Sequence, residues 1–459
     1  MKLVQEYKTQ GIYIIIGLLG LLFPFFDISY LLLGFLGMSL VFLRLTPASP
    51  VFGILARDYD IKAGKLVGLA QLFIITAILL FISLVLGPGR FPLFIIGGAF
   101  AITTFGDGVA DIINIHYKAK NSRLHNDTKV YSAKSSIAFL VSGSIYAFLT
   151  GAWILVWADH AVYPVPYGML FFLAVIGAIT GAFLESVTVT DDNITVPLGS
   201  AMAMWLFYTS GFSYNVDTGY LLMILAFAFI LGYLAYRARI ADISAMLSAT
   251  LLGVVIIISS NIFWFFILLA FFFLGSLFTR YKYNYKLAHG IAEKKGGMRG
   301  YKNVFSNSLA ALALAVAYRI FFPSHDMLLL AAYLGSIATA CGDTLASEIG
   351  QTYQGEPRMI TTLKKARAGT DGAVSSLGEG ASIFGASVIA LLAILLIPGI
   401  ENTYGIAVAV IAGGFIGTNI DSVLGATFQQ RGYLSNNGVN LFATISGAVV
   451  SGMVYLAGS

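Results

Sequence analysis

Residues 66–86 read LVGLAQLFIITAILLFISLVL, a stretch without charge that is long enough to cross a bilayer as a helix. Apolar residues follow one another in it without polar alternation, which disfavours the strand of a membrane barrel. Similar stretches recur along the 459 residues, of which 58% are hydrophobic and only 11% charged. This composition predicts an all-α polytopic membrane protein and excludes disordered, fibrous, secreted disulfide-rich and nucleic-acid-binding classes.

The apolar stretches predict about fifteen transmembrane helices on the twenty-residue criterion. Their expected ranges are 11–27, 29–46, 66–86, 92–112, 136–157, 167–187, 194–211, 219–236, 242–259, 261–279, 304–322, 327–349, 373–397, 404–424 and 439–457.

The distribution of basic residues predicts the orientation of these helices. With the N-terminus inside, all 27 Lys and Arg except Arg90 and Arg319 lie on the cytoplasmic side. We therefore expect a cytoplasmic N-terminus and an external C-terminus. The opening MKLVQEYKTQ lacks a small-residue cleavage site, so the first helix is expected to remain as an anchor.

Cysteine and histidine contribute little to the expected chemistry. The single Cys341 excludes an intramolecular disulfide and a thiolate-bound zinc cluster, and the five His have no metal-ligand spacing.

Two acidic motifs repeat along the chain. TFGDGVA (104–110) matches ACGDTLA (340–346), and LESV (184–187) matches IDSV (420–423), both at an offset of 236 residues. The offset pairs Asp107 with Asp343 and Glu185 with Asp421. An offset of eight predicted helices keeps the orientation, so we expect two parallel seven-helix repeats, 1–212 and 241–459, joined by a linker helix within 213–240.

The repeated carboxylates lie near basic loops, and acidic residues within membrane helices are functional candidates. Asp107 and Asp343 are candidate Mg²⁺ ligands, and a basic Gly/Ser/Thr loop next to bound Mg²⁺ suits a nucleoside triphosphate. In the second half, KKARAGTDGAVSS (364–376) precedes a helix whose N-terminal amides add anion affinity. Glu348 and Glu185 are candidates for a general base.

Each feature also has a structural interpretation. The basic loops could serve only to orient the chain and to attract anionic headgroups. The aspartates could form interhelical hydrogen bonds.

The motifs themselves resemble two families. Residues 1–212 resemble the phytol kinase and dolichol kinase family through GDGVA (106–110), KS (134–135), the ES pair at 185–186 and especially DDNITVPL (191–198). Residues 241–459 resemble the phytyl-phosphate kinase family. That similarity rests on GDTLASEIG (342–350), PRMITTLKKARAGTDGAVSSLGEGAS (357–382), GGFIGTNIDSVLGATFQ (413–429) and NNGVN (436–440).

The resemblance implies phosphorylation of isoprenoid alcohols and their monophosphates, with CTP as donor and Mg²⁺ as cofactor. Asp107 and Asp343 would be the metal or nucleotide-site carboxylates, completed at the cytoplasmic rims by Glu185 and Asp421. The nucleotide- and phosphate-binding groups would be Lys134, Ser135, Asp191, Asp192, Asn193, Lys364, Lys365, Arg367, Gly369, Thr370, Asn436 and Asn437.

The first half departs from its family pattern. Asn114 stands where a Gly is usual, and Ile137 and Ala138 replace a Glu-Gly pair. We therefore expect monophosphate kinase activity in the second half, dependent on Asp343, Lys365 and Asp421 but not on Asp107.

The sequence as a whole predicts an integral-membrane isoprenoid kinase with cytoplasmic sites. Its partners would be the bilayer, a prenyl alcohol or monophosphate and a nucleoside triphosphate, and a homo-oligomer stays open. The alternatives are a transporter or lipid scramblase, which also uses repeats and intramembrane polar residues, and a cytidylyltransferase that forms a CDP-lipid. A non-catalytic interaction protein is the least favoured class.

Overall fold

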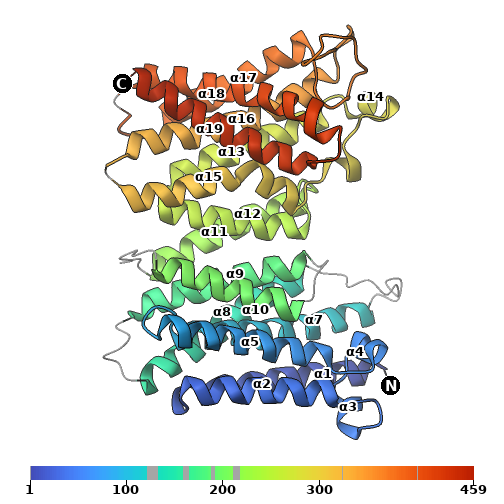
Figure 1. Ribbon diagram of the computed structural model, residues 1–459. Helices are drawn as coiled ribbons and strands as arrows, with labels where there is room; N and C mark the ends of the chain where they lie inside the picture. The colour runs from blue at the N-terminus through green and yellow to red at the C-terminus, as the bar shows by residue number, and fades with distance from the viewer. Residues whose placement is uncertain are drawn as a thin grey trace. The chain divides into compact units, whose positions relative to one another are not determined.

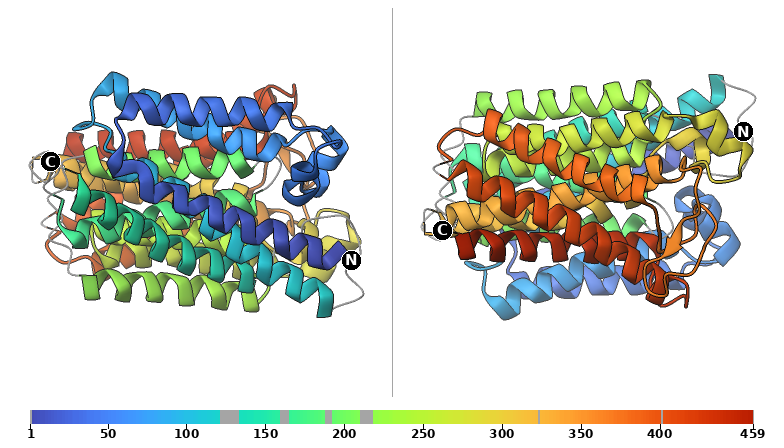
Figure 2. Two further views of the ribbon diagram at one scale, coloured as in Figure 1. Left: turned by 90° about the horizontal axis from the view of Figure 1, so that it is seen from below. Right: turned by 90° about the horizontal axis from the view of Figure 1, so that it is seen from above.

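Almost all of the described part of the chain is helical in the computed structural model (Figure 1). The structure describes residues 2–120, 133–158, 165–187, 192–209, 218–322, 324–400 and 402–458. It divides into two compact units, Met1–Met223 and Ile224–Ser459, and the division falls inside helix α11 (Thr218–Arg237). In each unit the long helices run alongside one another as a bundle (Figure 2).

Unit 1 is built from helices, including a 3₁₀ segment η1 and a π-helical segment η2. They are α1 (Lys2–Gly17), η1 (Leu18–Phe25), α2 (Ile28–Arg44), α3 (Pro50–Leu55), α4 (Asp58–Ala63), α5 (Val67–Leu86), α6 (Leu93–Ala101), η2 (Ile102–Gly106), α7 (Asp107–Lys120), α8 (Ala133–Trp157), α9 (Tyr167–Ser186) and α10 (Asp192–Thr209).

Unit 2 adds a two-stranded antiparallel ladder, in which Arg358 pairs with Val374 and Met359 with Ala373. Its elements after α11 are α12 (Ile243–Ser259), α13 (Ile262–Arg280), α14 (Tyr283–Ala288), η3 (Lys294–Gly297), α15 (Tyr301–Phe321), α16 (Asp326–Gly350), β1 (Arg358–Met359), β2 (Ala373–Val374), α17 (Ser376–Leu396), α18 (Thr403–Leu424), η4 (Gly425–Gln429, π-helical) and α19 (Asn436–Gly458).

The predicted membrane architecture is confirmed. Twelve helices of the described residues are long and apolar enough to cross a membrane. Each of the fifteen predicted ranges coincides with a helix, and the three beyond those twelve are α2, α10 and α12. α12 ends just before Ser260, and α13 begins just after it. The start of α13 is fixed by Asn261, which caps the helix by accepting a hydrogen bond from Phe263 N at 2.9 Å. The short helices α3, α4 and α14 and the β1–β2 ladder were not predicted.

Five helices correspond between the units in order and in packing. α5, α6–α7, α8, α9 and α10 of unit 1 match α15, α16, α17, α18 and α19 of unit 2, and the same neighbour pairs recur, such as α9 with α10 and α18 with α19. The spans that hold the Gly-Asp motifs, Leu93–His116 and Asp326–Gly350, are the most buried in their units. Each therefore forms the centre of its bundle.

The first two helices of the units pack differently. In unit 1, α1 lies against α7 and α2 against α5. In unit 2 the order is reversed, since α12 lies against α15 and α13 against α16.

Small residues bring the central helices of unit 2 close together. A Cβ on Gly447 of α19 would lie only 1.8 Å from Thr339 Oγ1 of α16, and one on Gly413 of α18 would lie 2.6 Å from Gly447 O. Thr339 also donates a hydrogen bond to Gly413 O at 3.1 Å. Such small-residue contacts are typical of membrane helices, which lack a hydrophobic drive to associate.

Candidate active site

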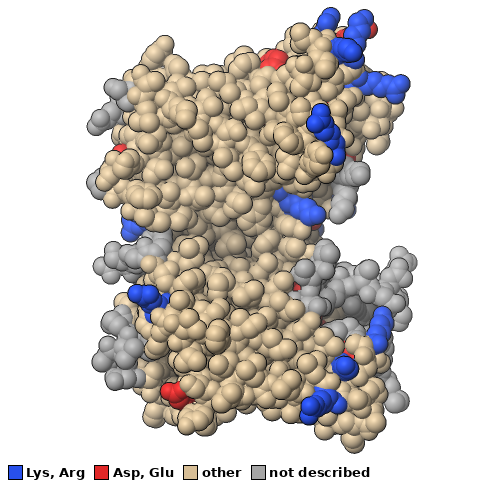
Figure 3. All heavy atoms as spheres, viewed as in Figure 1, with Lys and Arg blue, Asp and Glu red and all other residues tan. Residues whose placement is uncertain are grey.

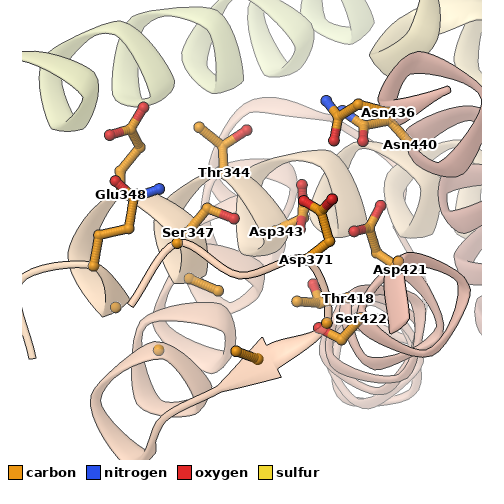
Figure 4. Close-up of a pocket in the computed structure, with 18 of the residues that line it drawn as sticks. Asp343, Thr344, Ser347, Glu348, Asp371, Thr418, Asp421, Ser422, Asn436 and Asn440 are labelled. Carbon is orange, nitrogen blue, oxygen red and sulfur yellow. The ribbon is translucent and has the colours of Figure 1, made fainter. Parts of the chain in front are cut away.

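One cavity of about 630 Å³ opens in unit 2 at the end of α16 that carries Asp343 (Figure 4). Its walls come from α13, α15, α16, α17, α18, α19 and the segment between α16 and α17. Gly342 lets these helices converge, because a Cβ there would lie 2.9 Å from Thr418 Oγ1 and 3.1 Å from Ser382 O. The Gly of the Gly-Asp motif thus places the aspartate at the meeting point of three helices.

Three aspartates from different elements line this cavity: Asp343 of α16, Asp421 of α18 and Asp371 of the α16–α17 segment (Figure 4). Asp421 interacts electrostatically with both of the others. Its Oδ2 atom is buried and has no hydrogen-bond partner among the described residues. Its unsatisfied buried oxygen is a candidate ligand atom for a divalent cation, although the oxygens of the three aspartates are spaced more widely than the 4.8 Å of the acidic cluster in unit 1.

Asp371 was missed by the sequence analysis, although it lies inside the KKARAGTDGAVSS motif. The following residue, Gly372, has φ +77° and lies against the end of α18, where a Cβ would be 2.6 Å from Ser422 O and 2.5 Å from Ala426 Cβ. Only glycine permits that conformation and that approach. The sequence feature that could have identified Asp371 is its place directly before a glycine in this turn.

The basic residues of this segment lie elsewhere. The structure leaves Lys364, Lys365 and Arg367 exposed, and none is among the residues that line the cavity. Lys365 Nζ pairs with Glu356 at 2.5 Å, both side chains being 65% exposed. Gly369 and Thr370, in contrast, line the cavity.

Arg299 is a second residue that the sequence analysis missed. Its backbone is fixed against the start of α12, because Arg299 N donates to Ile240 O at 2.8 Å and Arg299 O accepts from Asp242 N at 2.9 Å. Its guanidinium lies in the cavity beside α13, where Gly275 leaves room for it: a Cβ there would be 2.9 Å from Nη2.

Burial lowers the pKa of the Arg299 guanidinium from its usual value, against the opposing effect of three nearby carboxylates, those of Glu348, Glu293 and Asp343. The usual pKa of arginine is so high that the group stays charged at neutral pH. Arg299 is the only basic residue among the described residues that line the cavity.

Glu348, a candidate general base, also lines the cavity but is already paired. Lys286 of α14, whose side chain is fully buried, donates to Glu348 Oε2 at 2.5 Å and to Phe278 O at 3.0 Å. This ion pair holds Glu348 at the wall of the cavity.

Small polar side chains complete the lining. Thr344 and Ser347 of α16 and Asn436 and Asn440 of α19 project into the cavity (Figure 4). The predicted Asn436 therefore lies at the site, whereas Asn437 is not among the lining residues.

Unit 1 has its own acidic cluster. Single carboxylate oxygens of Asp107, Asp111 and Glu185 lie within 4.8 Å of one another. Arg57, just before α4, contacts this cluster: its Nη2 is 3.2 Å from Asp107 Oδ2. Gln10 links the two, accepting from Arg57 at 3.1 Å and donating to Asp111 Oδ2 at 2.7 Å.

Other predicted residues of unit 1 are dispersed around this cluster. Lys134 is exposed in the first turn of α8, while Ser135 is buried beside it. Asp192 and Asn193 begin α10, with Asn193 buried. Asp191 lies outside the described residues.

Comparison with known proteins identifies the second half of the chain. Residues 226–448 match the family described as integral membrane protein DUF92. An uncharacterized membrane protein of Methanocaldococcus jannaschii is 32% identical over 226 residues, which are 49% of this chain and 90% of that protein. This chain belongs to the DUF92 family. The matched residues lie within unit 2 and include the whole lining of the cavity.

Two further relatives match the chain over a similar length and at similar identity. An uncharacterized membrane protein of Synechocystis is 37% identical over 204 residues, 44% of this chain and 78% of that protein. Protein VTE6, chloroplastic, of Arabidopsis thaliana is 30% identical over 213 residues, 45% of this chain and 63% of that protein. No solved structure matches the chain.

Proposed function

We propose that the DUF92 half of this protein is a membrane kinase that transfers a phosphoryl group from a nucleoside triphosphate, CTP by resemblance, to an isoprenoid monophosphate. The proposal is supported by similarity to Protein VTE6 and by the motif resemblance to phytyl-phosphate kinases. The observation that carries it is a cavity in which three aspartates face one arginine at the end of a membrane helix.

The buried unpaired Oδ2 of Asp421 supports the proposal that these aspartates bind Mg²⁺. Asp343, Asp371 and Asp421 would hold the ion, which would neutralise phosphate charge when bound. Thr370 and Gly369, in the turn before α17, would face the phosphates of the nucleotide. Phosphoryl transfer needs mainly such positioning and charge neutralisation.

The acceptor is better explained as a monophosphate than as an alcohol. A monophosphate oxygen is largely deprotonated near neutral pH, since its second pKa is about 6. It can attack the terminal phosphorus of the nucleotide without a general base, forming the new P–O bond as the bond to the departing nucleoside diphosphate breaks. Glu348, the candidate general base in α16, already forms an ion pair with Lys286.

A lipid substrate also accounts for the apolar scaffold. The prenyl tail would lie among the membrane helices while its phosphate reaches the cavity at their end. Phosphorylation of an alcohol would then belong to unit 1, which resembles the phytol and dolichol kinases.

The test uses purified protein in detergent with CTP or ATP, Mg²⁺, and a panel of prenyl alcohols and monophosphates. We expect prenyl diphosphate and CDP from the monophosphate. Release of pyrophosphate with a CDP-lipid would identify a cytidylyltransferase instead. Absence of nucleotide turnover, together with lipid movement between leaflets of reconstituted vesicles, would identify a scramblase.

A further inference from the structure

Arg299 is a charged group without a partner. Its guanidinium makes no hydrogen bond or ion pair with any described residue, and its nearest aromatic contact is the Phe271 ring, 5.9 Å from Cζ. Burial disfavours its charge, as the lowered pKa of the group reflects. The residue is half-buried, and its guanidinium lines the cavity, where an anion can reach it.

None of the three neighbouring carboxylates, those of Glu348, Glu293 and Asp343, forms an ion pair with Arg299 among the described residues. Glu348 has the largest effect of the three on Arg299, but its Oε2 atom is bound by Lys286. Asp343 acts on Arg299 from a distance beyond the 4 Å of an ion pair. The guanidinium is thus held near the acidic cluster but kept apart from it.

Unit 1 also brings an arginine to its acidic cluster, and that arginine is already paired. Arg57, just before α4, pairs with Asp107, donates to Gln10 and lies 3.8 Å over the Tyr13 ring. Each half therefore brings an arginine to its aspartate, and only the one in unit 2 remains available to an external anion.

We propose that Arg299 is the phosphate anchor of the cavity: it binds the oxygens of a phosphate group, that of the lipid monophosphate or of the nucleotide, opposite the three aspartates. This inference rests on the proposed function for the identity of the substrates. A planar guanidinium matches two phosphate oxygens at once, which a lysine ammonium cannot do. The anchor fixes the phosphate against an otherwise acidic wall, which by itself would repel it.

Anion binding is measured first without any turnover. The thermal unfolding temperature of the purified protein is followed against inorganic pyrophosphate in the presence of MgCl₂. We expect stabilisation of the native protein, with the apparent Kd raised at least about tenfold in Arg299→Ala and by less in Arg299→Lys, since charge-assisted hydrogen bonds contribute about 1.5–3 kcal/mol.

Arg319→Ala is the matched control. It removes an exposed arginine from the last turn of α15, the helix that Arg299 precedes. It should bind pyrophosphate as the native protein does. If Arg299→Ala does not fold, Arg299→Lys carries the test. Equal affinity in the Arg299 variants and the native protein, or no stabilisation of the native protein, overturns the anchor.

Steady-state kinetics then distinguish the source of the phosphate. A raised KM for the prenyl monophosphate with an unchanged KM for CTP assigns Arg299 to the lipid, and the reverse assigns it to the nucleotide. Unchanged kinetics in Arg299→Ala overturn the anchor while leaving the kinase intact. Arg299-dependent pyrophosphate binding without turnover of any substrate pair would instead support the anchor and refute the proposed function.

Discussion

Arg57 and Asp107 form an ion pair in unit 1, with 3.2 Å between Nη2 and Oδ2 and side chains only 11% and 4% exposed. The pair gives the first acidic cluster a bound cation, whereas Arg299, the arginine that lines the second cavity, forms no ion pair with a described residue. This difference suggests that the two halves have diverged in role while keeping the same five-helix frame.

The ion pair predicts a stability effect. Arg57→Gln leaves Asp107 buried without its partner, and breaking a buried pair typically costs about 3–5 kcal/mol. We expect a clear fall in the thermal unfolding temperature in detergent. Arg57→Gln/Asp107→Asn should recover part of the loss, because no uncompensated charge remains. Strictly additive single effects would mean that the two residues are not coupled.

Asp343→Asn is predicted to reduce monophosphate kinase turnover at least about tenfold, or 1.4 kcal/mol of barrier. The substitution preserves shape but removes a carboxylate from the cluster of three. Asp326→Asn, at the other end of α16, provides the control for any general effect on that helix. Native turnover in a folded Asp343→Asn protein would make Asp343 structural.

Asp107→Asn is predicted to spare monophosphate turnover, since its carboxylate already pairs with Arg57 in unit 1. If unit 1 is active, the same variant should lose alcohol phosphorylation. Both substrates are assayed on the same preparation. Loss of monophosphate turnover with intact folding would show that the halves build one shared site.

The membrane architecture was predictable because helix length and apolarity are local properties of the sequence. Each expected range became a helix, and the repeated motifs selected carboxylates that interact within each unit, Asp107 with Glu185 and Asp343 with Asp421. In unit 2 the acidic motifs identified residues that line the cavity.

The rest of the site depends on tertiary contacts that no local pattern specifies. Arg299 reaches the cavity because its backbone pairs with residues 240 and 242, and Gly275 of another helix leaves space for it. Lys364 and Lys365 show the opposite case. They belong to a motif shared with the phytyl-phosphate kinases and were expected at the site, but the turn between β1 and β2 leaves them exposed. Spacing alone does not reveal which side of a turn faces the site.

Gly372→Ala is predicted to impair the site more than the bundle. The new Cβ would meet Ser422 O at 2.6 Å and would also strain a residue with φ +77°, so the turn must withdraw and take Asp371 with it. We expect turnover to fall at least about tenfold.

Gly432→Ala is the matched control, with φ +75° but no atom within 4 Å of the added Cβ. It should cost about 1–2 kcal/mol of stability from strain alone and leave turnover nearly native. Equal kinetic effects of the two substitutions would contradict a specific role for the turn.

The orientation of the chain in the membrane gives the last prediction. On this face of each unit, basic side chains gather at one end of the helices, with few at the other (Figure 3). The positive-inside rule assigns the basic end to the cytoplasm.

The native Cys341 is buried and is first replaced by Ala, which leaves single introduced cysteines as the only thiols. Lys62→Cys in unit 1 and Lys364→Cys in unit 2, both at exposed positions, should react with a membrane-impermeant maleimide only after the cells are permeabilised. Tyr404→Cys, at a position 80% exposed at the start of α18, should react in intact cells. Labelling of Lys364→Cys in intact cells would place the cavity on the external face, where nucleoside triphosphates are scarce, and would argue against the proposed kinase.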